Sequence, residues 1–515
     1  MRGVRPSSAE AEIVGDAHGT AGVTSVPNIV IVLLDCLRRD ALDEALNSPD
    51  TNALHILRRE SICYPGCIAP GSWTIPSHAS LFTGLYPWDH ATHLKGTLTL
   101  PSKPETLAEA LQLQGYATGS FSANGLIQPG TGLTRGFEET LWGGDREFLF
   151  RFLRNDQPSS RALRIPGGDC SELPDHRGDA LIGIADVLRR SVGVLDALNR
   201  VGGKVLHGSV DALPFVAPWI EPRLRSWLAD LPQEKPVFAF VNLIEAHEPY
   251  LIGGGFPVGF REWLRASVMV NASERWLLRR SSPSESYLQN AKLCYRRTIE
   301  AIDLRLARII QVLQECGRWD NTAFILTSDH GQSFWERNWF GHRAHLDESI
   351  CRIPLWIRPP RGRQLRLPLD EWVSLVDVAR TVASLAGRSS FGDPRSVDLS
   401  LDIRRRGGGA VYSFSDGILE REIEGLPDEV RGEVDRLVLA SYYGSSKTEC
   451  SWPGAIQSFG VSIDGPLREA TTDPTAPDVM RCREMATTEF DRVLTSISQG
   501  RTGRAYGRRL MGWGY

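Results

Sequence analysis

The sequence predicts an α/β fold in which a large, mostly parallel mixed sheet is flanked by helices, with a smaller sheet-containing region toward the C-terminus. Continuous apolar runs rich in β-branched and aromatic residues occupy 29–34, 237–243 and 322–327, the pattern of strands buried on both faces of a sheet. Amphipathic helical patterns fill the intervals, and this alternation is typical of a sheet covered on both sides. Each apolar run is followed at once by carboxylates or histidines, as expected where sites form at the carboxyl ends of parallel strands.

Composition places the chain among globular enzymes. It has 515 residues, of which 42% are hydrophobic and 23% charged, with a net charge of -4. This balance excludes a dominant disordered state and a global basic field that would attract nucleic acid. Residues 1–26 lack the apolar core of a signal peptide, and no run approaches the ~20 apolar residues of a membrane anchor. The nine irregularly spaced cysteines favour free thiols, so we expect a cytoplasmic protein.

The pattern along the chain predicts three parts. Residues 1–26 read as a flexible tail, 27–390 as the main domain with an insertion at about 140–235, and 391–515 as a smaller C-terminal domain. In that last part, 410–414 and 437–442 are candidate short strands.

Helix boundaries can be predicted from caps and stops. A capping-box pattern from Ser102 to Glu105 predicts the start of a helix. Single apolar faces at 299–313 and 375–385 predict two further helices, with Gly317 as the stop of the first and Gly387 as the stop of the second.

Two segments near the N-terminus carry candidate chemistry. Asp35 ends the first apolar run, where a carboxylate can hold a divalent cation or simply cap the next helix. Thr74 precedes Pro76, which suits the first turn of a helix, so Thr74 is expected just before a helix N-terminus. That position favours an alkoxide and a bound anionic group. In isolation, the same pattern is more typical of an ordinary N-cap threonine.

Three later segments add histidines. Asp329 and His330 follow the 322–327 run and are held by a glycine, which suits ligation of one metal ion. His342 and His345 are candidate ligands, acid or base groups, or surface histidines. His247 follows the 237–243 run, where it could protonate a leaving oxygen or serve as a hydrogen-bonded loop histidine.

Taken together and in this order, the segments resemble the sulfatase family within the alkaline-phosphatase superfamily. The resemblance covers about 27–138 and 236–390. The matching stretches are 28–40, 70–87 (PGSWTIPSHASLFTGLYP), 106–137, 238–250, 295–331, 342–355 and 373–387. The resemblance implies an alkaline-phosphatase-like α/β fold with a small C-terminal sheet.

The resemblance also implies a mechanism. A divalent metal ion (Zn, Mn, Ca or Mg) would be held by Asp35, Thr74, Asp329 and His330. Thr74 would be the nucleophile that attacks phosphorus or sulfur, because a bound metal lowers the pKa of its hydroxyl.

Two histidines complete the implied site. His247 and His342 would protonate or bind the leaving oxygen, and both, with His345, are the candidate ligands of any second ion.

The chain departs from the sulfatase pattern at four places. Sulfatases carry a Cys or Ser, oxidised to formylglycine, where this chain has Thr74, and an Arg where it has His78. Their second Asp is Cys36 here, and their Gly-Lys-Trp-His motif is replaced by Ser122-Ala-Asn124-Gly. Threonine is not a substrate for formylglycine formation, so we favour phosphoryl over sulfuryl transfer.

We therefore expect a metal-dependent hydrolase of phosphate mono- or diesters, acting on a small-molecule or conjugated ester, with no nucleic acid partner and no membrane anchor. A sulfate-ester hydrolase is the first alternative. A catalytically inactive binding protein that keeps the fold is the second. A phosphotransferase acting on a lipid or glycan ranks lower.

Overall fold

The computed structural model describes residues 26–49, 51–143, 217–248, 250, 258, 263, 281–362, 371–400, 409–418, 427–452, 454–467 and 469–499. The predicted tail and most of the predicted insertion, including the helical pattern at 180–198, lie outside these residues. The extent of the three predicted parts stays a prediction.

A seven-stranded sheet forms the centre of the molecule, in the order β2-β11-β7-β1-β6-β4-β5. Its strands are β1 (Asn28–Leu34), β2 (Ile62–Cys63), β4 (Ala117–Ser122), β5 (Glu139–Trp142), β6 (Val237–Leu243), β7 (Thr322–Thr327) and β11 (Leu355–Arg358). The five strands from β7 to β5 run parallel, while β11 pairs antiparallel with β7 and β2 antiparallel with β11. The predicted mixed, mostly parallel sheet is confirmed.

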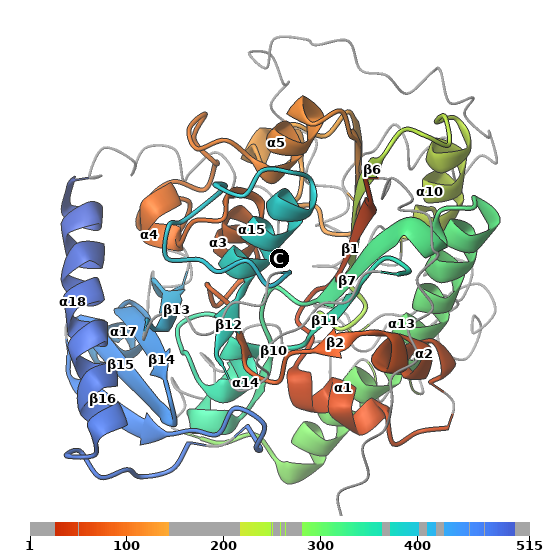
Figure 1. The fold of residues 1–515 in the computed structure, drawn as a ribbon. Coiled ribbons are helices and arrows are strands. Elements are labelled where there is room, and N and C mark those ends of the chain that lie inside the picture. The colour runs from red at the N-terminus through yellow and green to blue at the C-terminus, as the bar shows by residue number, and fades with distance from the viewer. Residues whose placement is uncertain are drawn as a thin grey trace, which may run out of the picture.

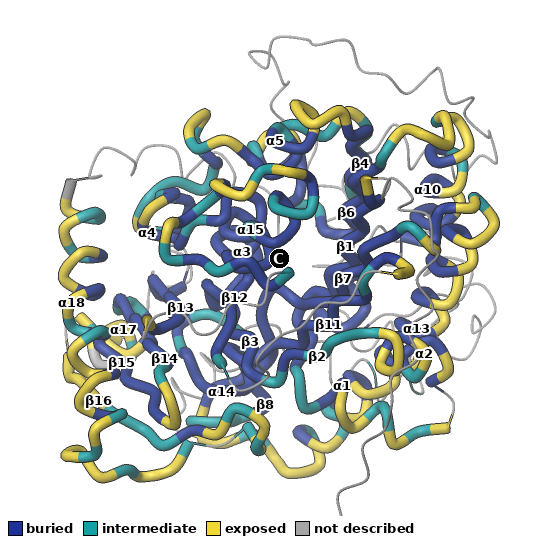
Figure 2. Tube along the Cα trace, in the orientation of Figure 1, coloured by how far each residue is buried: buried dark blue, intermediate teal, exposed yellow. Residues whose placement is uncertain are grey.

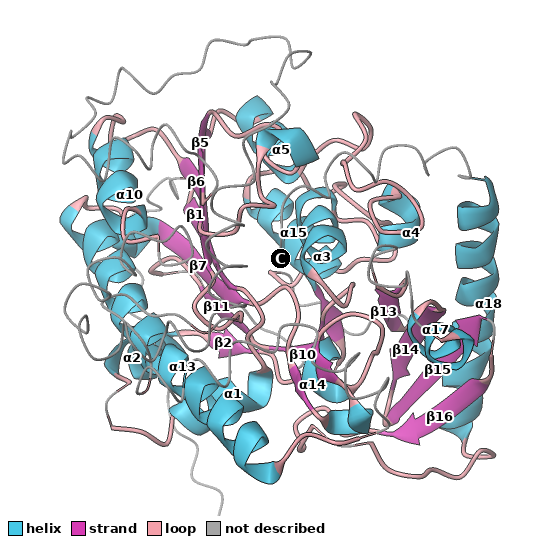
Figure 3. Ribbon diagram, turned by 180° about the vertical axis from the view of Figure 1, so that it is seen from behind, coloured by secondary structure: helices cyan, strands magenta, loops and turns pink. Residues whose placement is uncertain are grey.

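Helices cover both faces of this sheet (Figures 1 and 3). On one face lie α1 (Arg39–Ala45), α2 (Asn52–Glu60), α10 (Ile220–Ala229) and α13 (Glu285–Glu315). On the other lie α3 (Thr74–Thr83), α5 (Leu107–Leu113) and α15 (Leu375–Leu385). Alternate residues of β1 enter the two cores, Val30 and Val32 on one side and Ile29 and Ile31 on the other. Burial of each such side chain contributes about 1.5–3 kcal/mol, and Figure 2 shows the central strands wholly buried.

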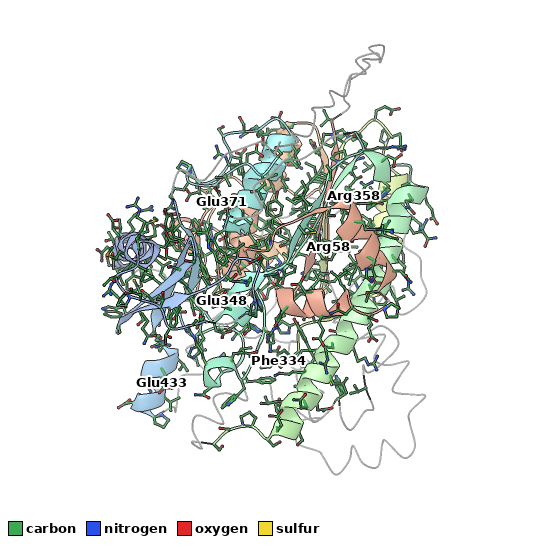
Figure 4. All side chains as sticks on the ribbon, turned by 60° about the horizontal axis from the view of Figure 1, so that its bottom comes forward. Arg58, Phe334, Glu348, Arg358, Glu371 and Glu433 are labelled. Carbon is green, nitrogen blue, oxygen red and sulfur yellow. The ribbon has the colours of Figure 1, made fainter. Side chains whose placement is uncertain are left out.

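A separate four-stranded antiparallel sheet forms toward the C-terminus, confirming the smaller sheet region. It consists of β13 (Val411–Ser415), β14 (Leu437–Tyr443), β15 (Ser446–Trp452) and β16 (Ile456–Gly460), in that order. Helix α18 (Pro477–Gln499) packs against it. Glu348 lies where this sheet meets the main body (Figure 4), and its carboxylate accepts a hydrogen bond of 2.8 Å from the Tyr442 hydroxyl.

Short elements connect these layers. They are β3 (Cys67–Ile68), β8 (Ser333–Phe334), β9 (Phe340–Gly341), β10 (Arg352–Ile353), β12 (Val373–Ser374), α4 (Pro87–His90), α14 (Glu348–Cys351) and α17 (Asp428–Val434), with 3-10 turns at Pro129–Thr131, Trp319–Asn321 and Glu336–Asn338. No helix in the described part of the chain has the length and apolar character needed to cross a bilayer.

The structure corrects two predicted boundaries. The capping box belongs to Thr106 and Glu109, whose side chains bond each other's backbone N–H groups at 3.2 and 2.8 Å, and not to Ser102 and Glu105. Helix α3 begins at Thr74 itself, with Trp73 as its N-cap, so Thr74 is the first helical residue and not the residue before the helix.

Candidate active site

The site forms where three neighbouring parallel strands end. Because β1 lies between β6 and β7, their carboxyl ends meet at one edge of the sheet. Asp35 follows β1, and its backbone N–H donates to the carbonyl of Leu243 at the end of β6 over 2.8 Å. Asp329 and His330 follow β7. Asp35, Asp329 and His330 are all fully buried, so the structure brings together three of the predicted metal ligands.

Each of these three side chains has one side held and the other side open to a ligand. Asp35 Oδ2 accepts from Asn124 Nδ2 at 2.7 Å, and Asp329 Oδ1 accepts from the backbone N–H groups of Cys36 at 3.2 Å and His330 at 2.9 Å. The remaining atoms, Asp35 Oδ1, Asp329 Oδ2 and His330 Nε2, have no hydrogen-bond partner among the described residues. Buried polar atoms are nearly always satisfied, so this convergence of acceptors fits a cation.

Charge in the site supports the same conclusion. Burial raises the pKa of the Asp329 carboxyl to about 7. Burial, with the nearby Asp329 charge, also raises the pKa of Asp35. Burial lowers the pKa of His330 to about 4, so the imidazole is neutral and can ligate a metal ion. Two buried carboxylates are costly to ionise together unless a positive charge compensates them, and the donor set of two carboxylates and an imidazole suits a divalent metal.

Thr74 lies beside this group through the first turn of α3. The Thr74 side chain is 3% exposed. His78, one turn later, places its Nδ1 2.9 Å from the Thr74 carbonyl oxygen and 3.5 Å from Asp329 Oδ2. His78 therefore joins the helix start to the Asp329 carboxylate. Burial lowers the pKa of His78 to about 4, so this imidazole is neutral. That Thr74 itself ligates the metal stays a prediction.

A second group of side chains adjoins the first through Cys36. One donor atom from each of Cys36, His247, Glu248 and His342 lies within 4.8 Å of the others. Gln332 bonds to two members of the group: its Oε1 lies 3.0 Å from His342 Nδ1, and its Nε2 donates to Glu248 Oε2 over 3.1 Å. The structure thus brings the predicted His247 and His342 together.

Comparison with known proteins identifies the family. The family model "Sulfatase" matches residues 27–145 and 221–388. The chain belongs to the sulfatase family. It is accordingly a hydrolase of ester bonds, in a superfamily whose enzymes are metal dependent.

Related proteins extend over most of the chain. A multifunctional alkaline phosphatase superfamily protein, PehA of Trinickia caryophylli, is 22% identical over 404 residues, which cover 72% of this chain and 75% of that protein. Human N-acetylglucosamine-6-sulfatase is 22% identical over 432 residues, covering 80% and 71%. The crystal structure of the phosphonate monoester hydrolase of Agrobacterium radiobacter superposes with a TM-score of 0.57 at 18% identity, covering 92% of this chain and 96% of that one. This last likeness shows the shared fold.

Two polar residues near these segments in the sequence lie outside both ligand groups. Glu245, which follows the same strand as His247, forms an ion pair with Arg305 of α13, which also pairs with Glu221 at 2.5 Å. His345 does not join either ligand group among the described residues, and its ring packs 4.9 Å from that of Trp339. The prediction that His345 is a candidate ligand is not supported by this placement.

Sequence reasoning missed the residues that hold the site in shape. Gln332 is one, although its position directly after the Asp-His-Gly turn was a usable signal. Arg38 is another: its guanidinium donates to the Gln332 backbone oxygen over 3.1 Å and pairs with Asp40 at 2.7 Å and Glu336 at 2.8 Å. These contacts fix the chain after the Asp-His-Gly turn. Asn124, noted in the sequence only as a departure from the family, is the partner of the first metal-type carboxylate.

Proposed function

We propose that the chain is a metal-dependent hydrolase of phosphate mono- or diesters that uses Thr74 as its nucleophile. The observation that carries this proposal is the buried trio of Asp35, Asp329 and His330, with its unpartnered ligand atoms, beside the N-terminus of α3 where Thr74 lies. Together with Thr74, these side chains would hold one divalent ion.

In the proposed reaction, the Thr74 oxygen attacks the phosphorus atom and the ester oxygen departs, leaving a phosphorylated threonine. Water then attacks this phosphorus and restores the hydroxyl, releasing phosphate from a monoester substrate or a phosphate monoester from a diester. The ion, when bound, lowers the pKa of the attacking hydroxyl and neutralises charge on the phosphoryl oxygens. The positive end of the α3 dipole at Thr74 favours binding of the anionic group there.

The second group lies on the leaving-group side in this proposal. In phosphoryl transfer the attacking and leaving oxygens are roughly in line. Thr74 is tied through His78 to the Asp329 side of the site. His247 and His342 lie beyond Cys36, and we assign them to the departing oxygen.

Two alternatives remain to be tested against this proposal. Sulfate esters are the alternative substrate class, since sulfatases are among the relatives. Against them stands Thr74, which formylglycine formation cannot modify. Loss of catalysis with retention of the fold is the other alternative. Against it stands the buried carboxylate pair, because a binding protein has no need of two costly ionisable groups with unpartnered atoms.

The test compares Thr74→Val with Thr74→Ser, using aryl phosphate monoester, diester and sulfate substrates with and without chelator. Thr74→Val keeps the shape of the buried side chain and removes its hydroxyl, so kcat should fall ~10³-fold or more. Thr74→Ser keeps a hydroxyl and should stay within about tenfold of wild type.

Near wild-type activity of Thr74→Val would show that the nucleophile is misassigned. Preferential cleavage of the sulfate would favour the first alternative. A protein that binds no metal and cleaves none of the esters would favour the second.

A further inference from the structure

We infer that the group of Cys36, His247, Glu248 and His342 is a second metal site, selective for zinc or a similar thiophilic divalent ion. The proposed function needs only one ion, so this second site goes beyond it. The site also specifies how His247 and His342 would act on the leaving oxygen, and only that role rests on the proposed function. In this group the Cys36 thiol joins two imidazoles and a carboxylate.

The hydrogen bonds of the histidines prepare them as metal ligands. His247 Nδ1 lies 2.5 Å from the backbone oxygen of Glu248, and His342 Nδ1 lies 3.0 Å from Gln332 Oε1. A carbonyl oxygen only accepts, so Nδ1 carries the proton in both rings and Nε2 keeps the lone pair. Because the His342 nitrogen that lies 3.7 Å from Cys36 Sγ is Nδ1, ligation through Nε2 requires this ring to turn toward the ion. Metal-binding histidines are oriented in this manner, through the N–H that does not face the ion.

Gln332 fixes this arrangement from both ends. Its Nε2 donates to Glu248 Oε2 at 3.1 Å and to the Tyr250 hydroxyl at 3.3 Å. Those two acceptors set the amide so that its oxygen faces His342. Gln332 is thus a positioning residue that holds the carboxylate and one imidazole of the group together.

The backbone at Cys36 adopts an uncommon conformation that places its thiol between the two groups. Its φ is +62°, a left-handed region that non-glycine residues seldom adopt. The Cys36 Sγ lies 3.6 Å from His330 Nδ1 and 3.7 Å from His342 Nδ1. Cys36 also belongs to a ligand group with Asp35 and His330. A thiolate here can therefore ligate the second ion next to the first.

The dimensions and chemistry of the group suit tetrahedral zinc. Bonds of about 2.0–2.3 Å place tetrahedral ligand atoms about 3.3–3.8 Å apart. One nitrogen, sulfur or carboxylate oxygen from each of the four residues lies within 4.8 Å of the others, so the group is close to this size before an ion binds. Thiolate and imidazole ligands favour zinc over magnesium or calcium. An ion at this place would neutralise the departing oxygen, so that neither histidine needs to donate a proton.

The test uses the full-length protein, stripped of metal by chelator under reducing, oxygen-free conditions and titrated with Zn²⁺ or Co²⁺. Wild type should bind about two equivalents of either ion and show the near-ultraviolet absorption of a Co²⁺–thiolate bond. Cys36→Ser should bind about one equivalent and lose that absorption. Asp329→Asn should also bind about one equivalent but keep it.

Two further variants keep the result interpretable. Cys63→Ser removes a partly exposed thiol outside both groups and should behave as wild type. If Cys36→Ser folds poorly, His342→Gln serves in its place, and it should likewise bind about one equivalent and lose the Co²⁺–thiolate absorption. One equivalent in wild type, with a thiolate band lost in both Cys36→Ser and Asp329→Asn, would assign Cys36 to the first ion and refute the second site.

The two proposals fail separately in these experiments. Two bound ions without Thr74-dependent ester cleavage would sustain the second site and refute the proposed function. One ion with Thr74-dependent cleavage would do the reverse.

Discussion

Replacing Asn124 by Ala should weaken binding of the first metal ion without unfolding the protein. Asn124 Nδ2 donates to Asp35 Oδ2 over 2.7 Å, and both side chains are fully buried. A hydrogen bond to a charged group contributes about 1.5–3 kcal/mol. Loss of a partner that orients a metal ligand costs about 10–100-fold in affinity, which corresponds to about 1.4–2.7 kcal/mol. The two estimates agree.

The assay is competition between the protein and a chelating dye for Mn²⁺ or Zn²⁺, paired with thermal melts of the metal-free protein. Excess metal should restore the activity of Asn124→Ala, because the ligands themselves remain. The matched control is Thr118→Val, which removes a partly buried hydrogen bond of 2.8 Å to the Gly136 oxygen near the start of β4. Asn124 follows the other end of the same strand. Unchanged affinity in Asn124→Ala, or an equal loss in Thr118→Val, would refute the reasoning.

Three further predictions address stability and the metal-binding turn. Replacing Arg305 by Met leaves two buried glutamates without their cation and should lower the free energy of unfolding by about 3–5 kcal/mol in denaturant melts, with metal content unchanged; a loss under 1 kcal/mol would contradict this. Burial raises the pKa of Glu449, but Lys447 and Arg337 outweigh it and lower the pKa to about 2. The stability that this carboxylate contributes is therefore complete above its ordinary pKa of 4.5 and lost as pH falls toward 2. Between these pH values the free energy of unfolding of Glu449→Gln should change less with pH than that of wild type. Equal pH dependence in the two proteins would contradict this prediction. Gly331→Ala places a Cβ 1.9 Å from a neighbouring backbone oxygen, so the turn must open and bound metal, measured by mass spectrometry, should fall about tenfold or more, whereas full occupancy would show that the turn can adjust.

Much of the fold could be predicted because strands buried on both faces appear in the sequence as continuous apolar runs. The strands at 237–243 and 322–327 were predicted to the residue, since both of their faces are covered and every position except Asn242 is apolar or small. The end of α15 was predicted for a different reason. Gly387 has a φ of +88°, a conformation that favours glycine after a helix.

The capping box shows where such signals become ambiguous. Residues 102–105 and 106–109 both fit the pattern of a capping box. The choice falls on the second because Thr106 also donates to the Arg135 backbone oxygen over 2.8 Å. That contact joins segments 29 residues apart, and local sequence does not specify it.

The site was likewise predictable in part: residues at strand ends were identified, and residues in irregular turns were not. The strand ends predicted Asp35, Asp329 and His330, because adjacency in a parallel sheet brings such residues together. The side-chain directions in the turn after β6 were not predictable. Glu245 pairs with a helix arginine and His247 joins the site, although they are only two residues apart. An irregular turn has no fixed period, so its residues cannot be assigned to a side from their order alone.

Three of the positions at which this chain departs from the sulfatase pattern contact the carboxylates of the candidate metal site. Cys36 donates its backbone N–H to Asp329, and the His78 imidazole lies 3.5 Å from the same carboxylate. Asn124 bonds to Asp35. Loss of function by drift would scatter changes and leave their neighbours without partners. Here Cys36, His78 and Asn124 each lie within 3.5 Å of Asp35 or Asp329. This clustering of the replacements around the two carboxylates supports the proposal that the centre still binds a metal ion.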